Sequence, residues 1–214
     1  MHKVKTLFKG YKSLLLLLFL MLFFRTAYAD WSHVPTSSME PTILPGDVIW
    51  INKTSFGPSI PFWNKRLFSW AQPERGDIIT FIPPHEDVLH VKRVIGVAGD
   101  SLTIRGNAVY INGIRMQQAI TKSTAEMVLG TEDLFGSEHA FKVSLERGVP
   151  YFGETITVPE GKLFVMGDFR NNSIDSRAWG FVDENRVTGK VSSVAVSFSR
   201  QREGLLARVA IPLQ

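Results

Sequence analysis

VLHVKRVIGVAGDSLTIRGNAVYING, residues 88–113, is the stretch that decides the fold class. Short runs rich in β-branched residues alternate here with Gly and Asn, which is typical of strands joined by tight turns. We predict strands at 88–97, 101–105 and 108–111, with hairpin turns at Gly106-Asn107 and Asn112-Gly113. The stretch therefore indicates antiparallel β structure.

The same pattern extends over most of the chain after residue 30, and no sustained helical period interrupts it. The clearest further strands are predicted at 47–52, 77–82, 155–158, 162–166 and 187–199. A mainly β fold, arranged as a barrel or sandwich, is therefore favoured over a βαβ layout. Residues 117–153 are more polar and less periodic, so they form either an inserted subdomain or a long loop.

Charge and cysteine content exclude several function classes. The 214 residues carry a formal net charge of +4, but residues 1–29 hold five basic residues and no acidic one. The remainder has 19 basic against 20 acidic residues, so the basic stripe that a nucleic-acid-binding protein needs is missing. The sequence contains no cysteine, which excludes disulfides, thiolate catalysis and cysteine-based zinc sites. The five histidines show no metal-binding spacing, and we expect no metal or organic cofactor.

An unbroken apolar run, LLLLLFLMLFF, occupies residues 14–24 and follows four lysines. A helix of this length spans only about 16 Å, which suits the core of a signal peptide better than a full membrane span. Ala27-Tyr28-Ala29 also resembles a cleavage site. Alternatively, residues 7–29 form one longer membrane helix whose basic side chains reach the interfaces. Either way, the lysines predict a cytoplasmic N-terminus, with the rest of the chain on the other side of the membrane.

Two features suggest hydrolytic chemistry. PTSSMEPT, residues 35–42, is a serine-rich turn soon after the apolar run, and Lys92 lies in the predicted strand with Arg93 beside it. Adjacent cations in a strand usually mark a solvated face. Alternatively, Lys92 is buried deeply enough for its pKa to fall toward neutrality, and it acts as a general base for a serine hydroxyl. A Gly-x-Ser-x-Gly nucleophile elbow and a glycine-rich phosphate loop are absent from the sequence.

Five sequence blocks then occur in a recognisable order. They are PTSSMEPT (35–42), RGDII (75–79), HVKRVIGVAGD (90–100), VYING (109–113) and GDFRNNSIDSR (167–177), the last followed by WGFV (179–182). In these blocks the chain resembles the bacterial type I signal peptidases, which are membrane-anchored serine endopeptidases with a Ser/Lys dyad. The resemblance favours the buried, catalytic interpretation of the lysine.

The resemblance implies a role for each matching residue. Ser38 would be the nucleophile and Lys92 the general base. The Ser38 backbone N–H and the Thr36 hydroxyl would form the oxyanion hole. Ser173 would hydrogen-bond the lysine ammonium, and Asp175 and Arg177 would form a buried ion pair that supports the site.

Substrate preference also follows from the resemblance. Family substrates carry small residues, usually alanine, one and three positions before the cut, and they bind as an extended strand. Shallow apolar pockets are therefore expected, and the candidates for their walls are Val34, Pro35, Met39, Ile43, Ile49 and Val91. His90 stands where the family often has tyrosine.

The resemblance implies a domain order and a location. We expect a basic cytoplasmic tail (1–12), a single transmembrane anchor (13–29), a catalytic β domain (30–102 and 161–214) and a small inserted β subdomain (103–160). The expected function is the removal of signal peptides from exported preproteins by a monomer on the outer side of the bacterial cytoplasmic membrane. The expected partners are preproteins and the lipid bilayer, with no nucleic acid.

Other functions remain open at this stage. A peptidase specialised for one export pathway, for example pilin maturation in conjugation, has the same residues. An anchored β domain that binds a partner without catalysis does not need Ser38 or Lys92. Self-cleaving repressors use a related Ser/Lys fold, but this class is excluded, because it would need an N-terminal DNA-binding domain where this chain has its apolar run.

Overall fold

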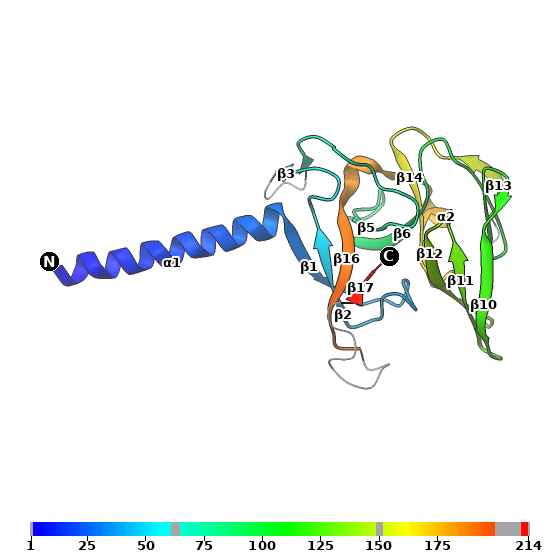
Figure 1. The fold of residues 1–214 in the computed structure, drawn as a ribbon, viewed down its shortest axis with the longest axis horizontal. Coiled ribbons are helices and arrows are strands. Elements are labelled where there is room, and N and C mark those ends of the chain that lie inside the picture. The colour runs from blue at the N-terminus through cyan, green and yellow to red at the C-terminus, as the bar shows by residue number, and fades with distance from the viewer. Residues whose placement is uncertain (1, 61–64, 149–151, 200–210, 214) are drawn as a thin grey trace.

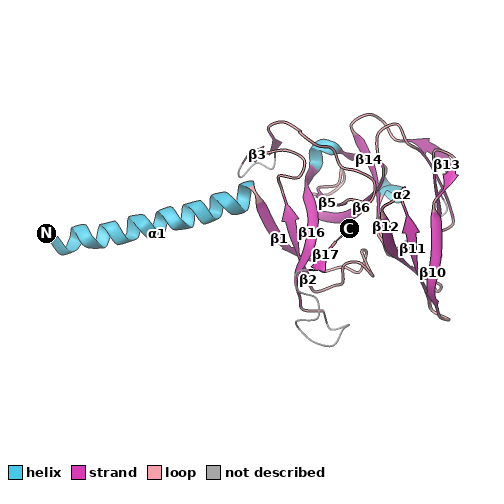
Figure 2. Cartoon of the chain, in the orientation of Figure 1, coloured by secondary structure: helices cyan, strands magenta, loops and turns pink. Residues whose placement is uncertain are grey.

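A mainly β domain with one N-terminal helix projecting from it is the architecture of this chain (Figures 1 and 2). The computed structural model describes residues 2–60, 65–148, 152–199 and 211–213. The helix, α1, runs from His2 to Ala27, and the first strand begins at Ala29. The predicted mainly β fold is therefore confirmed.

The apolar run lies within α1, but the transmembrane span expected at 13–29 is not confirmed. Among the described residues, no helix is both long enough and apolar enough to cross a membrane.

One large sheet forms the body of the domain. Its strands follow the order β1–β2–β16–β5–β6–β14–β15, with β17 beside β16. Their bounds are β1 Ala29–His33, β2 Asp47–Asn52, β16 Val187–Ser197, β5 Ile78–Phe81, β6 His90–Gly96, β14 Lys162–Met166, β15 Val182–Asp183 and β17 Ile211–Pro212. All of these pairings are antiparallel, which fits the short strands and tight turns of the sequence.

Smaller sheets are formed by residues 101–144 and 152–157, where the inserted subdomain is expected. One has the order β13–β7–β8–β9 and another the order β10–β11–β12. Their bounds are β7 Ser101–Arg105, β8 Ala108–Ile111, β9 Ile114–Arg115, β10 Gln117–Ser123, β11 Met127–Asp133, β12 Glu138–Ser144 and β13 Phe152–Thr157. A further pair joins β3 (Ser59–Ile60) to β4 (Lys65–Arg66). The expected boundary at residue 103 falls inside β7.

The hairpin at Asn112-Gly113 shows why turns of this kind can be predicted from the sequence. Both residues have positive φ angles, 54° and 79°, as a two-residue hairpin turn requires, and Asn and Gly tolerate this conformation best. The turn joins β8 to β9, so this sequence signal marks a real change of direction.

Buried side chains form three clusters that tie the sheets together. The first cluster contains Ile95 and Phe164 from the large sheet together with Leu102, Val109 and others from the small ones, so the smaller sheets share a core with the body. A second lies around Phe81 and Val94. The third comprises the buried residues Val34, Met39, Ile43, Ile49, Ile51, Ile78 and Val191. This third cluster lies under the loop that carries Ser38.

The described part of the domain also contains the short helix α2 (Ser176–Trp179) and the 3₁₀ turn η1 (Glu184–Arg186). Asp175 caps α2, because its side chain accepts a hydrogen bond from the Arg177 backbone N–H. The start of α2 is thereby fixed by the residue that precedes it.

Candidate active site

Ser38 and Lys92 meet across the domain although 54 residues separate them. Ser38 lies in the loop between β1 and β2, and Lys92 lies in the middle of β6, paired with Ile79 of β5. The Lys92 Nζ lies 2.8 Å from the Ser38 Oγ, and the lysine is only 5% exposed. The arrangement brings a hydroxyl nucleophile and an amine into direct hydrogen-bonding contact.

The environment of Lys92 favours its neutral form. Burial lowers the pKa of Lys92 from 10.5 to about 8; Arg177 adds to this effect, while Asp175 and Asp168 oppose it. Near neutral pH, a larger fraction of such an amine is neutral than of an exposed lysine. More of it is therefore able to accept a proton. The solvated-face interpretation of the two adjacent cations does not hold, since Arg93 is also fully buried, in an ion pair with Asp168.

The loop that carries Ser38 is closed at its base and anchored from below. The Val34 N–H donates to Asp47 O, and the Gly46 N–H donates to Val34 O, so the two ends of the loop are fastened together. Met39 and Ile43 point into the third core cluster and are at most 1% exposed. Because hydrophobic side chains next to the nucleophile are buried, the serine is held at the surface of the core.

The chain after β14 contacts Ser38 and its neighbour Ser37 directly. The Phe169 N–H donates to the Ser38 carbonyl at 3.1 Å, and the Asn172 side chain donates to the Ser37 Oγ at 2.7 Å. A Cβ on Gly167 would lie 2.4 Å from both the Ser38 carbonyl oxygen and the Ser173 Oγ. Only glycine allows this close approach, so the glycine sets the distance between the two loops.

The other residues expected at the site lie close by, with one difference. The Thr36 Oγ1 is 3.4 Å from the Ser38 Oγ. Asp175 and Arg177 form a buried ion pair at 2.7 Å, and Asp175 also accepts from the Gly167 N–H. The hydrogen bond expected between Ser173 and Lys92 is not formed: among the residues that the structure describes, the buried Ser173 Oγ has no hydrogen-bond partner.

A cleft of about 330 Å³ opens over the dyad. Four of the six residues expected to form its walls do line it: Val34, Pro35, Met39 and Val91. Ile43 and Ile49 instead lie in the third core cluster, fully buried, because their positions in the loop and in β2 face the sheet interior. The remaining wall includes His90, which stands where the family often has tyrosine. Its other residues were not predicted from the sequence: Ser32, His33, Glu86, Val88, Leu89, Asn172 and Ile174.

Part of that missed wall comes from one loop, residues 82–89 between β5 and β6. Val88 and Leu89 are apolar, exposed and directly before β6, and this was the signal in the sequence for a wall of the cleft. The predicted strand at 88–97 includes both residues, whereas β6 begins at His90.

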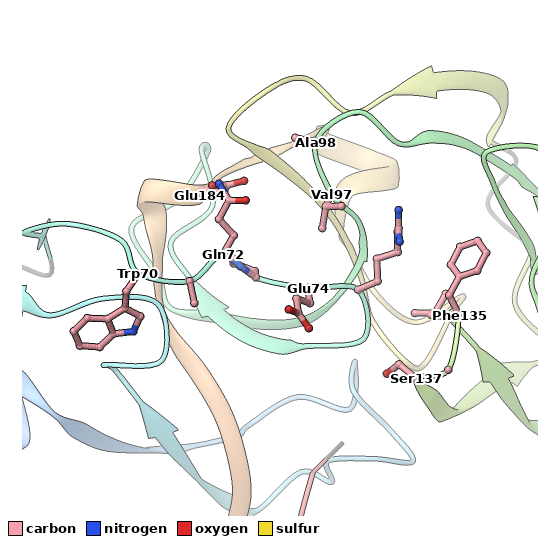
Figure 3. Close-up of a pocket in the computed structure, with 13 residues that line it drawn as sticks. Trp70, Gln72, Glu74, Val97, Ala98, Phe135, Ser137 and Glu184 are labelled. Atoms are coloured by element: carbon pink, nitrogen blue, oxygen red, sulfur yellow. The ribbon is translucent and has the colours of Figure 1, made fainter.

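A larger cavity of about 770 Å³ lies elsewhere on the domain (Figure 3). Trp70, Glu74, Phe135 and Ser137 are among its lining residues, whereas Ser38 and Lys92 are not. Its wall, as far as the structure describes it, includes neither lysine nor histidine, and its Arg75 is held by two hydrogen bonds to Asp100. This cavity therefore lacks the serine and base pairing that the smaller cleft has.

Lys142 of β12 connects the small sheet to the nucleophile loop. Its Nζ forms an ion pair with the buried Glu40 at 2.5 Å and lies 4.5 Å from the centre of the Phe169 ring. Its backbone accepts from the Arg170 N–H and donates to Asp168 O, as in a short parallel bridge. Glu40 lies two residues after Ser38, so this strand supports the nucleophile from behind.

Breaking this ion pair is expected to affect turnover more than binding. Lys142→Met is expected to lower kcat about tenfold with little change in KM, because a nucleophile displaced by a fraction of an ångström loses rate rather than affinity. The exchange of charges in the double variant Glu40→Lys with Lys142→Glu is expected to restore part of the loss. Steady-state kinetics on the three proteins, the original and these two variants, checks this; an unchanged kcat in Lys142→Met would refute the positioning role.

A second buried network joins β11 and β12 to Arg170, in the segment that follows β14. Glu132 and Arg170 form an ion pair with both side chains at most 1% exposed, and the Arg170 Nη2 lies 3.2 Å from the His139 Nε2. Burial, followed by the nearby Arg93, lowers the pKa of His139 from 6.5 to about 4. Although burial favours its neutral acid form, Arg170 keeps the pKa of Glu132 below its usual value. The histidine is therefore neutral beside a charged pair.

Mild acid is expected to destabilise the domain through His139. Between pH 6.5 and 4 the unfolded chain holds a proton on this histidine that the folded chain does not, so stability falls as the pH falls. The free energy of unfolding is expected to drop by about 2 kcal/mol between about pH 7 and about pH 5. Urea unfolding at both pH values, with His139→Gln beside the original, checks this. Equal pH dependence in the two proteins would exclude His139 as the cause.

Comparison with known proteins gives the family. The family model described as "Signal peptidase, peptidase S26" matches residues 7–196. The signal peptidase I of Pseudomonas aeruginosa is 30% identical over 87% of this chain and 72% of its own length. That of Rickettsia massiliae is 34% identical over 83% of this chain and 75% of its own length. A crystal structure of a signal peptidase I from Enterococcus faecalis V583 is 29% identical, covering 57% of this chain and 98% of that chain, with a TM-score of 0.39. The chain therefore belongs to the signal peptidase family, peptidase S26.

Proposed function

We propose that this enzyme removes signal peptides from exported preproteins by a Ser38–Lys92 mechanism and cuts after small residues. Membership of the signal peptidase family supports the reaction class. The observation that carries the mechanism is the 2.8 Å contact between the Lys92 amine and the Ser38 hydroxyl, made by a lysine that is nearly inaccessible to water.

In the first half of the reaction, neutral Lys92 takes the proton of the Ser38 hydroxyl as the Ser38 oxygen attacks the scissile carbonyl carbon. The carbonyl oxygen becomes an oxyanion, to which the Ser38 backbone N–H and the Thr36 hydroxyl would donate hydrogen bonds. The C–N bond then breaks, and the Lys92 ammonium returns its proton to the leaving amine. The signal peptide remains joined to Ser38 as an ester.

In the second half, water replaces the departed amine. The water oxygen attacks the ester carbon while Lys92 takes a proton from the water. Lys92 then passes this proton to the departing Ser38 oxygen. The free signal peptide leaves with a new carboxylate, and Lys92 is neutral again. The same amine thus serves both half-reactions, which requires that it stay close to the serine throughout.

The cleft supports a preference for small residues. Val34, Met39 and Val91 narrow it with apolar side chains, and its volume of about 330 Å³ is small for a substrate site. In an extended substrate, alternate side chains face the same side, so the first and third residues before the cut would share this wall. Alanine at both positions is the substrate pattern that fits.

Helix α1 supports a location at a lipid bilayer. Its leucines between residues 14 and 22 are between 49% and 63% exposed, and apolar side chains in such a row need an apolar environment. The basic residues Lys12 and Arg25 lie on either side of this row, where charged side chains would meet the polar surfaces of the bilayer. We propose that α1 holds the enzyme in the cytoplasmic membrane with the β domain on its outer face.

The test is cleavage of a preprotein whose signal peptide ends in Ala-x-Ala, by the full-length enzyme purified from the membrane fraction in detergent. The expected products, identified by intact mass, are the mature protein and the signal peptide cut after the second alanine. A matched preprotein with phenylalanine in place of that alanine is expected to resist cleavage. Absence of cleavage of the first substrate, or equal cleavage of both, would contradict the proposal, as would recovery of the enzyme outside the membrane fraction.

A further inference from the structure

One acidic residue, Glu86, lies in the described wall of the cleft. Its position suggests a preference for the charge of substrate residues, which the small apolar pockets do not explain. Of the residues described as lining the cleft, Glu86 alone bears a carboxylate, and Lys92 alone is a lysine or arginine. Lys92 is buried, whereas the Glu86 side chain is 42% exposed. A substrate entering the cleft therefore meets the negative charge at the surface.

Glu86 is held in position by two imidazoles. One carboxylate oxygen lies 2.9 Å from the His85 Nε2, and the other lies 3.6 Å from the His90 Nε2. The histidine rings pack edge to face at 6.4 Å, and the His85 ring also lies 5.6 Å from the Trp179 ring. The carboxylate is thus placed by packed rings rather than left to move freely on its loop.

The base of the same loop is also fixed. Arg186 donates a hydrogen bond to the Pro83 carbonyl at 3.1 Å, and the Ile82 N–H donates to the Arg186 carbonyl at 3.3 Å. On the other side of the loop, His90 begins β6, two residues before the catalytic-site lysine on the same face of the strand. Both ends of the loop that carries Glu86 are therefore held, one by hydrogen bonds to Arg186 and the other by β6.

The charge of Glu86 is not cancelled by its neighbour on β6. Burial, followed by the charge of Lys92, lowers the pKa of His90 below its usual value, so this imidazole is neutral at the pH where Lys92 is active. Within the described part of the chain the buried His90 Nδ1 has no hydrogen-bond partner, and the opposite nitrogen, Nε2, faces the carboxylate. An exposed, oriented carboxylate beside apolar Val88 and Leu89 is suited to a long cationic side chain, whose methylenes contact the apolar residues.

We propose that Glu86 is a specificity-determining residue that favours preproteins with lysine or arginine at the second or fourth position before the cut. The inference rests on the proposed function and names a substrate feature for the same cleft. Alternation along an extended strand directs these two positions away from the pocket that takes the small residues, toward its rim. The bound cation would form an ion pair with Glu86 at the surface of the cleft.

The experiment uses matched preproteins with Ala-x-Ala ends that differ only in Lys, Gln or Glu at the second or the fourth position. For the original enzyme, kcat/KM is expected to be about tenfold higher with Lys than with Glu at one of these positions, the size of a partly screened ion pair. Glu86→Gln is expected to shrink this ratio toward one, and Glu86→Lys to invert it. Asp87→Asn is the matched control, since Asp87 is the adjacent exposed carboxylate and does not line the cleft; it is expected to keep the ratio.

Salt gives a second measurement that needs no variant. Raising ionic strength from about 0.05 M to about 1 M is expected to reduce the Lys-to-Glu ratio of the original enzyme, because exposed charges are screened. A ratio near one in the original enzyme, or an equal ratio in Glu86→Gln, would overturn the inference while leaving the proposed function intact. If the preprotein with Gln is not cleaved at all, the proposed function itself fails.

Discussion

Replacing Ser38 with alanine or Lys92 with methionine is expected to lower kcat by about 10⁴-fold or more, because each change removes one half of a pair that acts as a unit. The contact between the two side chains, 2.8 Å from Nζ to Oγ, is the geometry that a proton transfer requires. For the same reason the double variant is expected to be scarcely slower than either single one. Single-turnover cleavage of the Ala-x-Ala preprotein measures all four proteins.

Two neighbouring substitutions serve as controls for this result. Ser37→Ala removes an adjacent serine hydroxyl that contacts Asn172 but not Lys92, and Lys162→Met removes a half-exposed lysine paired with Asp183. Both are expected to retain most of the rate. A Lys92→Met enzyme that keeps its rate would instead show that the lysine has a structural role and is not the general base.

Asp168→Ala is expected to destabilise the domain by about 3–5 kcal/mol, because it leaves the Arg93 guanidinium buried without its carboxylate. The two side chains are at most 1% exposed and share two hydrogen bonds, at 2.8 and 2.9 Å. Although burial favours the neutral acid, Arg93 lowers the pKa of Asp168, so the pair is charged at neutral pH. Against a typical stability of about 5–15 kcal/mol, this loss is large.

The matched control is Asp183→Ala, which removes a carboxylate 38% exposed and paired with the equally accessible Lys162. An exposed pair of this kind contributes at most about 1 kcal/mol. Urea unfolding followed by circular dichroism compares the two variants. Equal losses would show that burial of the Arg93–Asp168 pair is not what determines its contribution.

Much of the β fold was predictable because many of its strands show a local sequence pattern, a short β-branched run bounded by turn residues. Predicted strands at 101–105, 108–111 and 162–166 coincide with β7, β8 and β14, and the one at 47–52 coincides with β2. These segments are bounded by Gly, Asn or Pro, so their ends are marked in the sequence itself.

The polar stretch at 117–153 was harder because its strands lie near solvent. It contains β10, β11 and β12, and β10 is exposed along most of its length, so the alternation of apolar and polar residues that identifies a strand is weak there. Pairing with β11 and β12 supplies the stability that the local pattern does not show.

Only those site residues that lie in recognisable sequence motifs were predictable. The sequence places Ser38 and Lys92 in distinctive blocks, but it does not show that Lys142 reaches Glu40 from 102 residues away, or that Arg93 is buried against Asp168. Long-range ion pairs of this kind depend on how sheets pack. Ile43 and Ile49 illustrate the converse, since an apolar residue near a site is suited equally to a pocket wall and to the core beneath it.

The most direct test of the Ser38–Lys92 mechanism is the pH dependence of kcat/KM for the Ala-x-Ala preprotein. Since burial lowers the pKa of Lys92 to about 8, the amine is protonated and inactive as a base below that pH. The rate is therefore expected to fall about tenfold per pH unit below 8 and to level off above it. A rate that is independent of pH between about 6 and about 10, or that rises only near the ordinary pKa of lysine, would contradict a desolvated lysine base.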